Sequence, residues 1–417
     1  MRERIRRAVA VGRPGVVGPV TVGHGVNEFL SIVIPPVIPL LVTDFDITYG
    51  EAGLLLTVFF LMYLLFQLPA GILGDRIGGA RLIVVGLLAM VVGVGLASTA
   101  NSYGTLLAAQ AVAGIGGSTF HPAGMSVISD VEGATTEGRA MGVFGLGGTL
   151  GTMASPVVVG GVAAVAGWRL ALGVAAGLGL IVTGLAGPAL LRARGDRDDA
   201  ATTDGGRSPT VAGRIRSIIA NAGLVGGWPV VVLFAVTMML SMQTRGILTF
   251  TTAYVSTETG LSVLAGNLSF FGLLVGGSIV SVPAGGLADR RNRPRLGMIL
   301  GAGTAIIVAA TAVAIPVFSG LTRPVLVAIL AVWFATIGGV VYALFPLKNA
   351  LVSRRAETAS SGGLFGLIQT ASAIGSAAGP AVFGILATRW GVGAAFPAIS
   401  LTGVVLVALF AILSRLE

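Results

Sequence analysis

The sequence of 417 residues contains no cysteine and little charge. Without cysteine the chain can form no disulfide, no thiolate metal site and no thiol nucleophile. Charged residues make up 10% of the chain, too few to cover the surface of a soluble fold of this length, since a soluble domain carries roughly 25%. The chain has two histidines and contains neither an H-E-x-x-H nor a G-x-S-x-G pattern. It therefore lacks motifs that are typical of metal-dependent and nucleophilic catalysis. We therefore expect no enzyme, no cofactor and no bound metal.

Apolar residues and glycine are abundant instead. Hydrophobic residues make up 54% of the chain and the mean hydropathy is +0.94, which predicts a protein embedded in a lipid bilayer. The 64 glycines fit this prediction, because small residues let membrane helices approach closely. The net charge is +9, but the basic residues are scattered between apolar runs and form no patch with interleaved aromatics, so we expect no nucleic-acid partner.

The apolar runs are long enough to cross a membrane, which takes about 20 residues of helix. The sequence predicts twelve such runs, at 18–42, 52–74, 80–100, 103–129, 140–165, 168–191, 228–255, 263–288, 296–319, 322–350, 360–388 and 392–414. The first run is too long for a signal peptide and is expected to be a retained helix.

Arginines between the runs indicate the topology. They cluster in the N-terminal segment, at the C-terminus and in alternate loops, at 76–81, 192–216, 290–295 and 354–355. By the positive-inside rule both termini should be cytoplasmic in a multi-pass protein of the cell (plasma) membrane. Residues 192–227 are the long polar stretch of the chain and are expected to be a cytoplasmic linker. The linker separates a six-helix bundle at 1–191 from a second six-helix bundle at 228–417.

The two halves repeat each other. GIGGSTFHPAGMSVIS at 114–129 aligns with GGVVYALFPLKNALVS at 338–353 with an offset of 224, which matches Pro122 to Pro346. The same offset pairs Ser155-Pro156 with Gly379-Pro380. The sequence therefore predicts an all-α membrane protein built from two pseudo-symmetric bundles, an arrangement found in secondary transporters.

Few ionisable groups lie deep inside the predicted helices. Glu28 is the one carboxylate of 17 that lies deep inside a predicted helix, and Arg245 is the one of 26 cationic residues that clearly does. Both histidines, His24 and His121, also lie within predicted spans. A charge at mid-bilayer costs on the order of 3 kcal/mol, so such groups should face protein or a water-filled cavity. At about 1.5 Å per residue, the histidines should share a layer on the cytoplasmic side of Glu28.

The spacing of the polar residues places them on helix faces. His24, Glu28, Ser31 and Pro35 follow a helical repeat with Asn27 beside them, and Gln110 begins a similar stripe that includes His121. We expect Glu28, His24 and His121 to exchange the coupling proton, because a carboxyl in a low-dielectric cavity gains and loses a proton as its surroundings change and imidazole titrates near neutral pH.

Structural roles remain open for each of these residues. Glu28 could form a structural ion pair, the histidines could be packing residues, and Arg245 could pair with Glu28 across a central cavity instead of anchoring substrate charge. Further candidates for substrate binding are Asn27, Gln110, Tyr254, Tyr342 and Asn349. The two tyrosines could equally be interfacial anchors.

The pattern G-x-L-x-D-R with further basic residues occurs after the second run and again after the eighth, and it resembles the signature loop of the major facilitator superfamily. The resemblance covers essentially the whole chain and implies the major facilitator fold, with helices 1, 4, 7 and 10 lining the transport path. It also implies that these loops latch the two halves during gating. The matching positions are Gly71, Asp75, Arg76, Gly78, Arg81, Gly285, Asp289, Arg290 and Arg293.

Two short segments resemble the fosmidomycin-resistance type of efflux protein. They are the His24-x-x-Asn27-Glu28 start with its proline cluster, and STFHPAG on helix 4. Helix 5 is similar to the motif associated with antiporters, with serine in place of one glycine and one extra spacing residue. The helix 5 motif and its helix 11 counterpart contain Gly151, Pro156, Gly160, Gly161, Gly375, Gly379 and Pro380.

The sequence therefore predicts a secondary active transporter that works by alternating access, as a proton-coupled exporter of a small organic compound or drug. It is expected to be a monomer whose partners are its small-molecule substrate, protons and the bilayer. Proton-coupled uptake of a small organic or inorganic anion is the alternative. A transport-inactive membrane sensor is an alternative of another class.

Overall fold

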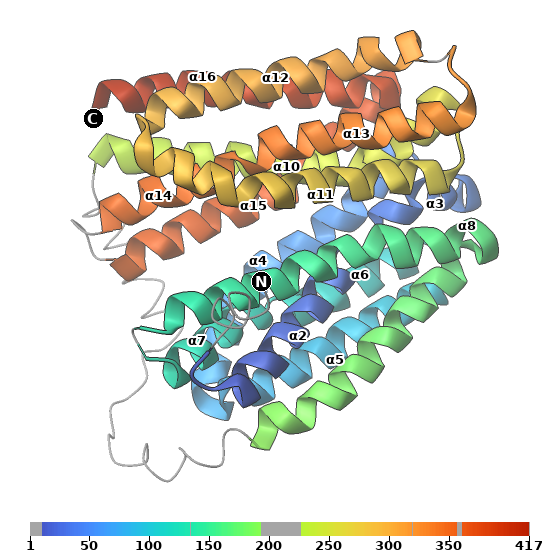
Figure 1. Ribbon diagram of the computed structural model, residues 1–417. Coiled ribbons are helices and arrows are strands. Elements are labelled where there is room, and N and C mark those ends of the chain that lie inside the picture. The colour runs from blue at the N-terminus through green and yellow to red at the C-terminus, as the bar shows by residue number, and fades with distance from the viewer. Residues whose placement is uncertain (1–10, 134, 193–226, 319, 357–360, 417) are drawn as a thin grey trace, which may run out of the picture. The chain divides into compact units, whose positions relative to one another are not determined.

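A computed structural model of the chain describes residues 11–133, 135–192, 227–318, 320–356 and 361–416. Every regular element in these ranges is a helix (Figure 1). In chain order they are α2 (Pro14–Ser31), η1 (Pro35–Val37), α3 (Ile38–Phe45), α4 (Tyr49–Ile77), α5 (Gly79–Ser98), α6 (Tyr103–Gly117), α7 (Phe120–Val131), α8 (Glu137–Arg192), α10 (Gly227–Thr259), α11 (Val263–Arg290), α12 (Arg293–Phe318), α13 (Arg323–Tyr342), α14 (Leu344–Ala356), α15 (Ser361–Trp390), η2 (Val392–Ala394) and α16 (Ala395–Leu416).

Ten segments of the described chain are long and apolar enough to cross a membrane. The longest, α8, has 56 residues, which is about 84 Å of helix and more than twice the thickness of a bilayer core. Gly167 divides it, because its φ of 80° lies outside the helical region and is readily adopted by glycine. Counting α8 as two spans and the broken pair α6 and α7 as one gives twelve, which agrees with the predicted fold class.

Proline explains where the first membrane helix breaks. Helix α2 ends at Ser31 and a 3₁₀ turn begins at Pro35, because Pro35 and Pro36 have no backbone N–H to donate to the preceding turn. The carbonyl of Ile32 receives a different hydrogen bond, from the hydroxyl of Ser155 on α8 at 2.8 Å. The serine that departs from the glycine pattern of helix 5 therefore satisfies a backbone acceptor that the prolines leave unpaired.

The internal repeat is visible in two broken helices. Helix α6 ends at Gly117 and α7 resumes at Phe120, while α13 ends at Tyr342 and α14 resumes at Leu344. Each break lies just before the matched prolines, Pro122 and Pro346, which cannot continue the hydrogen-bond ladder.

The described chain folds into two compact units. The first contains the described residues of Met1–Val33, Met62–Val162 and Ala166–Ala212, and the second contains those of Ile34–Leu61, Ala163–Val165 and Gly213–Glu417. Helices 1 and 2 of the chain are thus each shared between the units. The predicted linker at 192–227 lies outside the described residues except at its two ends, so the predicted bundle boundaries stay a prediction.

Glycines set the helix packing inside each unit. In the first unit a Cβ on Gly116 of α6 would lie 2.6 Å from the backbone of α5, so the two helices are in direct backbone contact. In the second unit α11 and α13 lie side by side (Figure 1), and Gly276 and Gly338 occupy their contact. Close approach of this kind is the usual way for helices to associate in lipid, where no hydrophobic effect drives them together.

Glu132, between α7 and α8, ties these helices to the start of α2. Its carboxylate accepts hydrogen bonds from the backbone N–H groups of Gly12 at 2.9 Å and Arg13 at 2.8 Å. A negative charge at a helix N-terminus satisfies unpaired donors and interacts favourably with the helix dipole. Hydrogen bonds from Thr136 and from the Arg13 backbone hold the pKa of Glu132 below its usual range.

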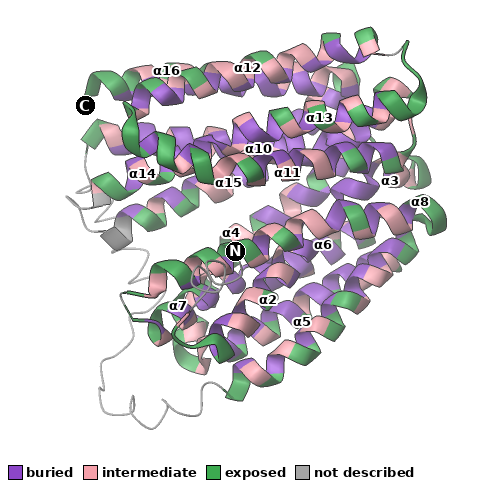
Figure 2. Ribbon diagram, viewed as in Figure 1, coloured by how far each residue is buried: buried purple, intermediate pink, exposed green. Residues whose placement is uncertain are grey.

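Burial differs between membrane helices. Helix α10 is buried along most of its length, whereas α12 and α16 show long exposed faces (Figure 2). The exposed residues on α12 and α16 are largely aliphatic, among them Ile299, Ile306, Val313 and Leu401. An apolar outer surface of this kind is what contact with lipid requires.

Candidate functional site

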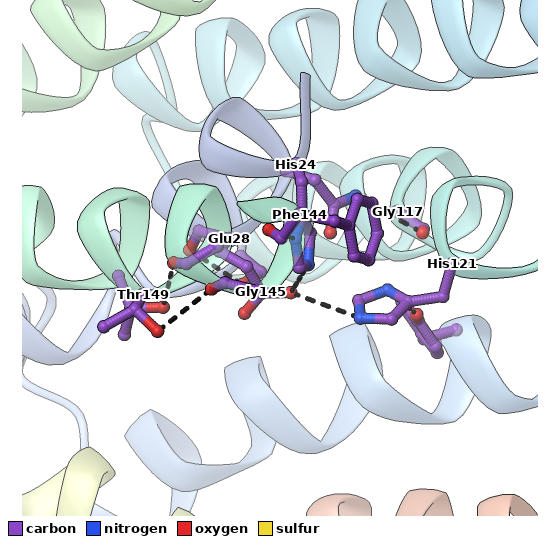
Figure 3. Close-up of polar contacts among 12 residues, drawn as sticks. His24, Glu28, Gly117, His121, Phe144, Gly145 and Thr149 are labelled. Atoms are coloured by element: carbon purple, nitrogen blue, oxygen red, sulfur yellow. Dashed lines mark hydrogen bonds and ion pairs between the residues drawn. The ribbon is translucent and has the colours of Figure 1, made fainter. Parts of the chain in front are cut away.

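Three ionisable side chains converge inside the first unit (Figure 3). His24 and Glu28 lie one turn apart on α2, and His121 lies on α7 immediately before the proline of that helix. The carboxylate oxygen Oε1 of Glu28 is 3.7 Å from Nε2 of His24 and 3.8 Å from Nε2 of His121. The predicted proton-coupling residues are therefore neighbours in the structure.

Two phenylalanine rings pack against the imidazole of His24. Phe144 of α8 stacks on it with ring centroids 3.9 Å apart, and Phe120 of α7 stacks at 5.6 Å. The Nδ1 atom of His24 lies 2.8 Å from the backbone carbonyl oxygen of Phe144. Because a carbonyl can only accept, Nδ1 is the donor, and the neutral ring carries its lone pair on Nε2.

His121 is held by a side chain instead of a backbone group. Its Nδ1 atom lies 2.9 Å from the hydroxyl of Tyr63 on α4, and either atom of this pair can be the donor. The ring meets that of His24 edge-on, with centroids 5.0 Å apart. The side chain of His121 is 28% exposed, compared with 20% for Glu28 and 8% for His24.

The cluster brings the titratable atoms of three side chains close together. Nε2 of His24 is buried without a hydrogen-bond partner, and it faces a carboxylate oxygen that also lies beside Nε2 of His121. The ligating atoms of the three residues lie within 4.8 Å of one another. This donor set also suits a divalent cation, and the sequence-based expectation of no metal stays a prediction.

Glycine at position 148 leaves the space that His24 occupies. A Cβ added to Gly148 would overlap the imidazole ring, with Nδ1 and Nε2 both 2.8 Å away. We expect Gly148→Ala to displace His24 from the Phe144 carbonyl and to lower proton-gradient-driven transport at least about tenfold, because overpacking of this size costs about 1–3 kcal/mol. Flux into proteoliposomes under an imposed pH gradient measures the effect.

Gly145→Ala is the matched control, because it lies one turn away on the same helix and its added Cβ would meet no heavy atom within 4 Å. This variant should transport at the wild-type rate. Thermal unfolding of both purified variants separates a local effect on His24 from loss of the fold. Equal fluxes for the two variants would show that the position of the His24 ring does not matter.

Comparisons with known proteins agree with this arrangement of helices. The sequence profile of the Major Facilitator Superfamily matches residues 20–380. The chain belongs to this superfamily. It is therefore a multi-pass membrane protein of a transporter superfamily, and no enzyme family is indicated.

Individual relatives match shorter segments. The chain is 28% identical over 144 residues to the fosmidomycin resistance protein of Escherichia coli, a match that covers 34% of this chain and 35% of that protein. It is 28% identical over 130 residues to a riboflavin transporter of Clostridioides difficile, covering 31% and 28%. The chain thus spans about a third of the length of these relatives.

The fold extends over the whole chain. A bacterial homologue of the human lysosomal transporter Spinster, in an inward-facing and unoccupied conformation, matches with a TM-score of 0.75 at 16% identity, covering 97% of both chains. At this identity the likeness confirms the predicted major facilitator fold alone.

In the first unit, two residues that are predicted to bind substrate are buried. Asn27 is 1% exposed and donates to Sδ of Met90 at 3.2 Å and to the carbonyl of Gly117 at 3.4 Å, so it joins α2 to α5 and α6. Gln110 is 2% exposed, and its Nε2 atom has no hydrogen-bond partner. Their contact with substrate stays a prediction.

The second unit contains the other predicted binding residues. Arg245 is half-buried on α10, and its guanidinium carbon lies 4.3 Å from the ring centroid of Phe60. Tyr254 is buried against Phe396, Tyr342 is half-buried beside Phe345, and Asn349 is exposed. That these three residues and Arg245 bind the same substrate stays a prediction. The predicted pairing of Arg245 with Glu28 joins residues of different units and also stays a prediction.

The signature loops occupy helix ends. Asp289 pairs with Arg293 at 3.7 Å, and Arg293 donates to the carbonyls of Ala288 and Ala350, which links α12 to α14. Gly78 precedes α5 with a φ of 88°, a conformation that favours glycine. The remaining positions lie at the same two helix junctions, with Gly71, Asp75, Arg76 and Arg81 at the first and Gly285 and Arg290 at the second. Their latch role stays a prediction.

The helix 5 and helix 11 motifs pack against the first helix of each half. Gly151 of α8 meets the backbone of Gly25 on α2, and Gly375 and Gly379 of α15 meet the backbone at Met238 and Met242 on α10. Pro156, Gly160 and Gly161 continue α8, and the carbonyl of Pro380 lies against Gly53. Equivalent helix pairs are thus in contact in the two halves, as the repeat predicts.

Sequence reasoning missed Tyr63, Phe120 and Phe144. The two phenylalanines carry no signal in an apolar run. Tyr63 could have been identified from the sequence, because it lies at the centre of the run 52–74. Tyrosines in membrane helices concentrate near the helix ends instead. A tyrosine at mid-span needs a partner for its hydroxyl, and here His121 provides it.

Proposed function

We propose that this transporter is a proton-coupled exporter of a small organic compound, working by alternating access. The observation that carries the proposal is the convergence of Glu28, His24 and His121, which makes one shared site for a proton inside a membrane-embedded bundle. Similarity to a fosmidomycin resistance protein supports export as the direction.

The chemistry of coupling follows from the cluster. A proton on Glu28 neutralises the carboxylate, and its transfer to a histidine leaves a carboxylate beside an imidazolium. The two states differ in charge distribution, so each can favour a different exposure of the site as the transporter alternates. Proton movement down its gradient then drives substrate in the opposite direction.

Arg245 supports a second candidate, uptake of a small anion. A half-buried guanidinium in a membrane helix interacts strongly with a carboxylate, phosphate or similar group, because its donors form bidentate hydrogen bonds. The guanidinium carbon of Arg245 lies 4.3 Å from the Phe60 ring centroid, a cation–π contact that uses none of those donors. Substrate charge and transport direction therefore need to be measured together.

The orientation and assembly form part of the same proposal. We place the protein in the cell membrane with both termini in the cytoplasm, because the arginines cluster at the termini and in alternate loops. We expect a monomer, since the cluster of Glu28, His24 and His121 is completed within one chain.

The test is a panel of neutral, cationic and anionic compounds assayed in proteoliposomes by solid-supported-membrane currents, followed by flux in everted vesicles. Under a pH gradient acid inside, an exporter drives its substrate into everted vesicles, whereas proton-coupled uptake moves substrate out with the proton. Currents that depend on substrate but not on the pH gradient would reject proton coupling. Absence of both current and flux across the whole panel would favour the sensor alternative, because electroneutral exchange gives flux without current.

A further inference from the structure

We propose that the two histidines have different tasks in the proton-coupling site, an inference that rests on the proposed function. His24 holds a proton on a single nitrogen and returns it to Glu28. His121 conducts the proton between Glu28 and the hydroxyl of Tyr63, and Tyr63 is the residue at which the cluster exchanges its proton with solvent.

The restriction on His24 comes from its hydrogen bond to the backbone. Nδ1 donates to the carbonyl of Phe144 at 2.8 Å in the neutral and in the charged ring, so only Nε2 can take up or release a proton. Contacts with Phe144, stacked 3.9 Å away, and with Phe120, at 5.6 Å, pack the ring in this orientation. A histidine that gains and loses its proton on one atom stores a proton but cannot pass it onward.

His121 has a partner on each side. Nε2 faces Glu28 at 3.8 Å, and Nδ1 contacts the Tyr63 hydroxyl at 2.9 Å. A hydroxyl can donate and accept, so neither tautomer of His121 is excluded. His121 and Tyr63 are both partly exposed, whereas His24 is buried, so the path from His24 through Glu28 to His121 and Tyr63 leads from a buried to a partly exposed side chain.

Two transfers along this path balance. When protonated Glu28 gives its proton to Nε2 of His121, the carboxyl O–H bond breaks and an N–H bond forms, leaving a carboxylate and an imidazolium. The imidazolium then releases the proton from Nδ1 to the Tyr63 oxygen, while Tyr63 gives its own proton to a solvent water. One proton has left Glu28, His121 is neutral as the Nε2–H tautomer, and no charge remains on Tyr63. His121 must return to the Nδ1–H tautomer before it accepts another proton from Glu28 at Nε2.

The distances and surroundings fit this sequence of steps. Separations of 3.7 and 3.8 Å are ion-pair distances and exceed a hydrogen bond, so the Glu28 carboxyl must rotate toward one histidine or the other. The titratable groups that face His121 are Glu28 and His24 from α2 and Tyr63 from α4, while α8 contributes the uncharged ring of Phe144.

Transport tests the conducting role of Tyr63. Tyr63→Phe keeps the ring and removes the hydroxyl, so pH-gradient-driven flux in proteoliposomes should fall at least about tenfold, the low end for loss of a proton-transfer group. Substrate exchange without a gradient should be unchanged. Tyr49→Phe is the matched control on the same helix, because it removes a hydroxyl that contacts Thr257 and lies away from the cluster. This variant should keep the wild-type driven flux.

Combined substitutions test whether the residues act in series. His121→Gln should lower pH-gradient-driven flux as Tyr63→Phe does. The double variant should be no slower than the slower single variant, because both substitutions interrupt the same proton path. Independent, additive losses would overturn the relay. Driven flux that is unchanged in Tyr63→Phe would also overturn it.

Nitrogen NMR tests the assignment of tautomers without any transport. The chain has two histidines, so ¹⁵N-histidine labelling of the full protein gives two ring systems, which His121→Gln assigns. Neutral His24 should be the Nδ1–H tautomer throughout the titration, whereas His121 should show both tautomers in exchange, and Tyr63→Phe should change that balance. An Nε2–H form of neutral His24 would overturn the proposal.

The two kinds of measurement separate this inference from the proposed function. If the wild-type protein showed no pH-gradient-driven flux, proton coupling would fail whatever the tautomers are. If Glu28→Gln abolished driven flux but Tyr63→Phe kept it, coupling would stand and the relay would be wrong.

Discussion

Replacing Glu28 by glutamine is expected to abolish pH-gradient-driven transport and to leave substrate exchange between equal compartments in place. Glutamine has nearly the shape of protonated glutamic acid, so the helix packing around position 28 is kept. It cannot release or accept the coupling proton, and the two histidines lose the carboxylate oxygen that lies 3.7 and 3.8 Å from them. We expect driven flux to fall by at least about 100-fold, the scale of an essential proton-transfer group.

The measurement compares flux into proteoliposomes with and without an imposed pH gradient. Glu51→Gln is the matched control, because Glu51 lies at the start of α4 and accepts hydrogen bonds from the backbone and hydroxyl of Thr48. That carboxylate has a capping role, so the control should lose some stability and keep its coupling. Driven transport that persists in Glu28→Gln would reject the role of Glu28.

The thermal stability of Glu28→Gln carries separate information. If Glu28 were a structural ion pair, its replacement would leave buried partners unsatisfied and lower the melting temperature. If its role is proton exchange, the neutral amide should be tolerated at least as well as an ionisable group in the same place. Thermal unfolding in detergent therefore distinguishes the two roles that the sequence leaves open.

The sequence predicts those features of the site that depend on one helix. The four-residue spacing of His24 and Glu28 places them on one face of a helix, and the scarcity of charge in the spans makes Glu28 conspicuous. The prolines predict the breaks, since the missing N–H acts locally. Helix depth predicts that His121 shares a layer with His24 on the cytoplasmic side of Glu28, whereas its 3.8 Å approach to Glu28 depends on how α7 packs against α2 and was not predicted.

The environment of the histidines depends on tertiary packing and escaped prediction. The stacking of Phe144 on His24 requires α8 to approach α2 closely, which Gly148 permits, and periodicity cannot show which helix supplies the ring. A helix that is apolar on all sides has no polar face that would show which side points toward a given neighbouring helix. The division of helices 1 and 2 between two compact units likewise follows from packing between segments distant in sequence.

Arg245 is the residue whose replacement should define substrate charge. Its guanidinium carbon lies 4.3 Å from the Phe60 ring centroid, and the described residues of its own unit provide no carboxylate in an ion pair with it. A half-buried cation in this setting favours an anionic group from outside the protein. The cation–π contact with Phe60 does not use the N–H donors of the guanidinium, which can form bidentate hydrogen bonds to such a group.

We expect Arg245→Gln to weaken binding of an anionic substrate roughly 10- to 100-fold, because a hydrogen bond to a charged group contributes about 1.5–3 kcal/mol. Binding of neutral substrates should be unchanged. Arg245→Lys should recover part of the affinity, since the charge remains and the bidentate geometry is lost. Half-saturation concentrations from substrate-induced currents at fixed pH measure these effects.

Arg389→Gln is the control for stacking without a binding role, because Arg389 lies over the ring of Trp390 at the end of α15. It should leave all affinities unchanged. If Arg245→Gln instead abolished driven transport of every substrate, whatever its charge, Arg245 would act on the coupling site as the partner of Glu28. Selective loss of anionic substrates assigns the residue to the binding site, because a general partner of the carboxylate cannot discriminate between substrates by their charge.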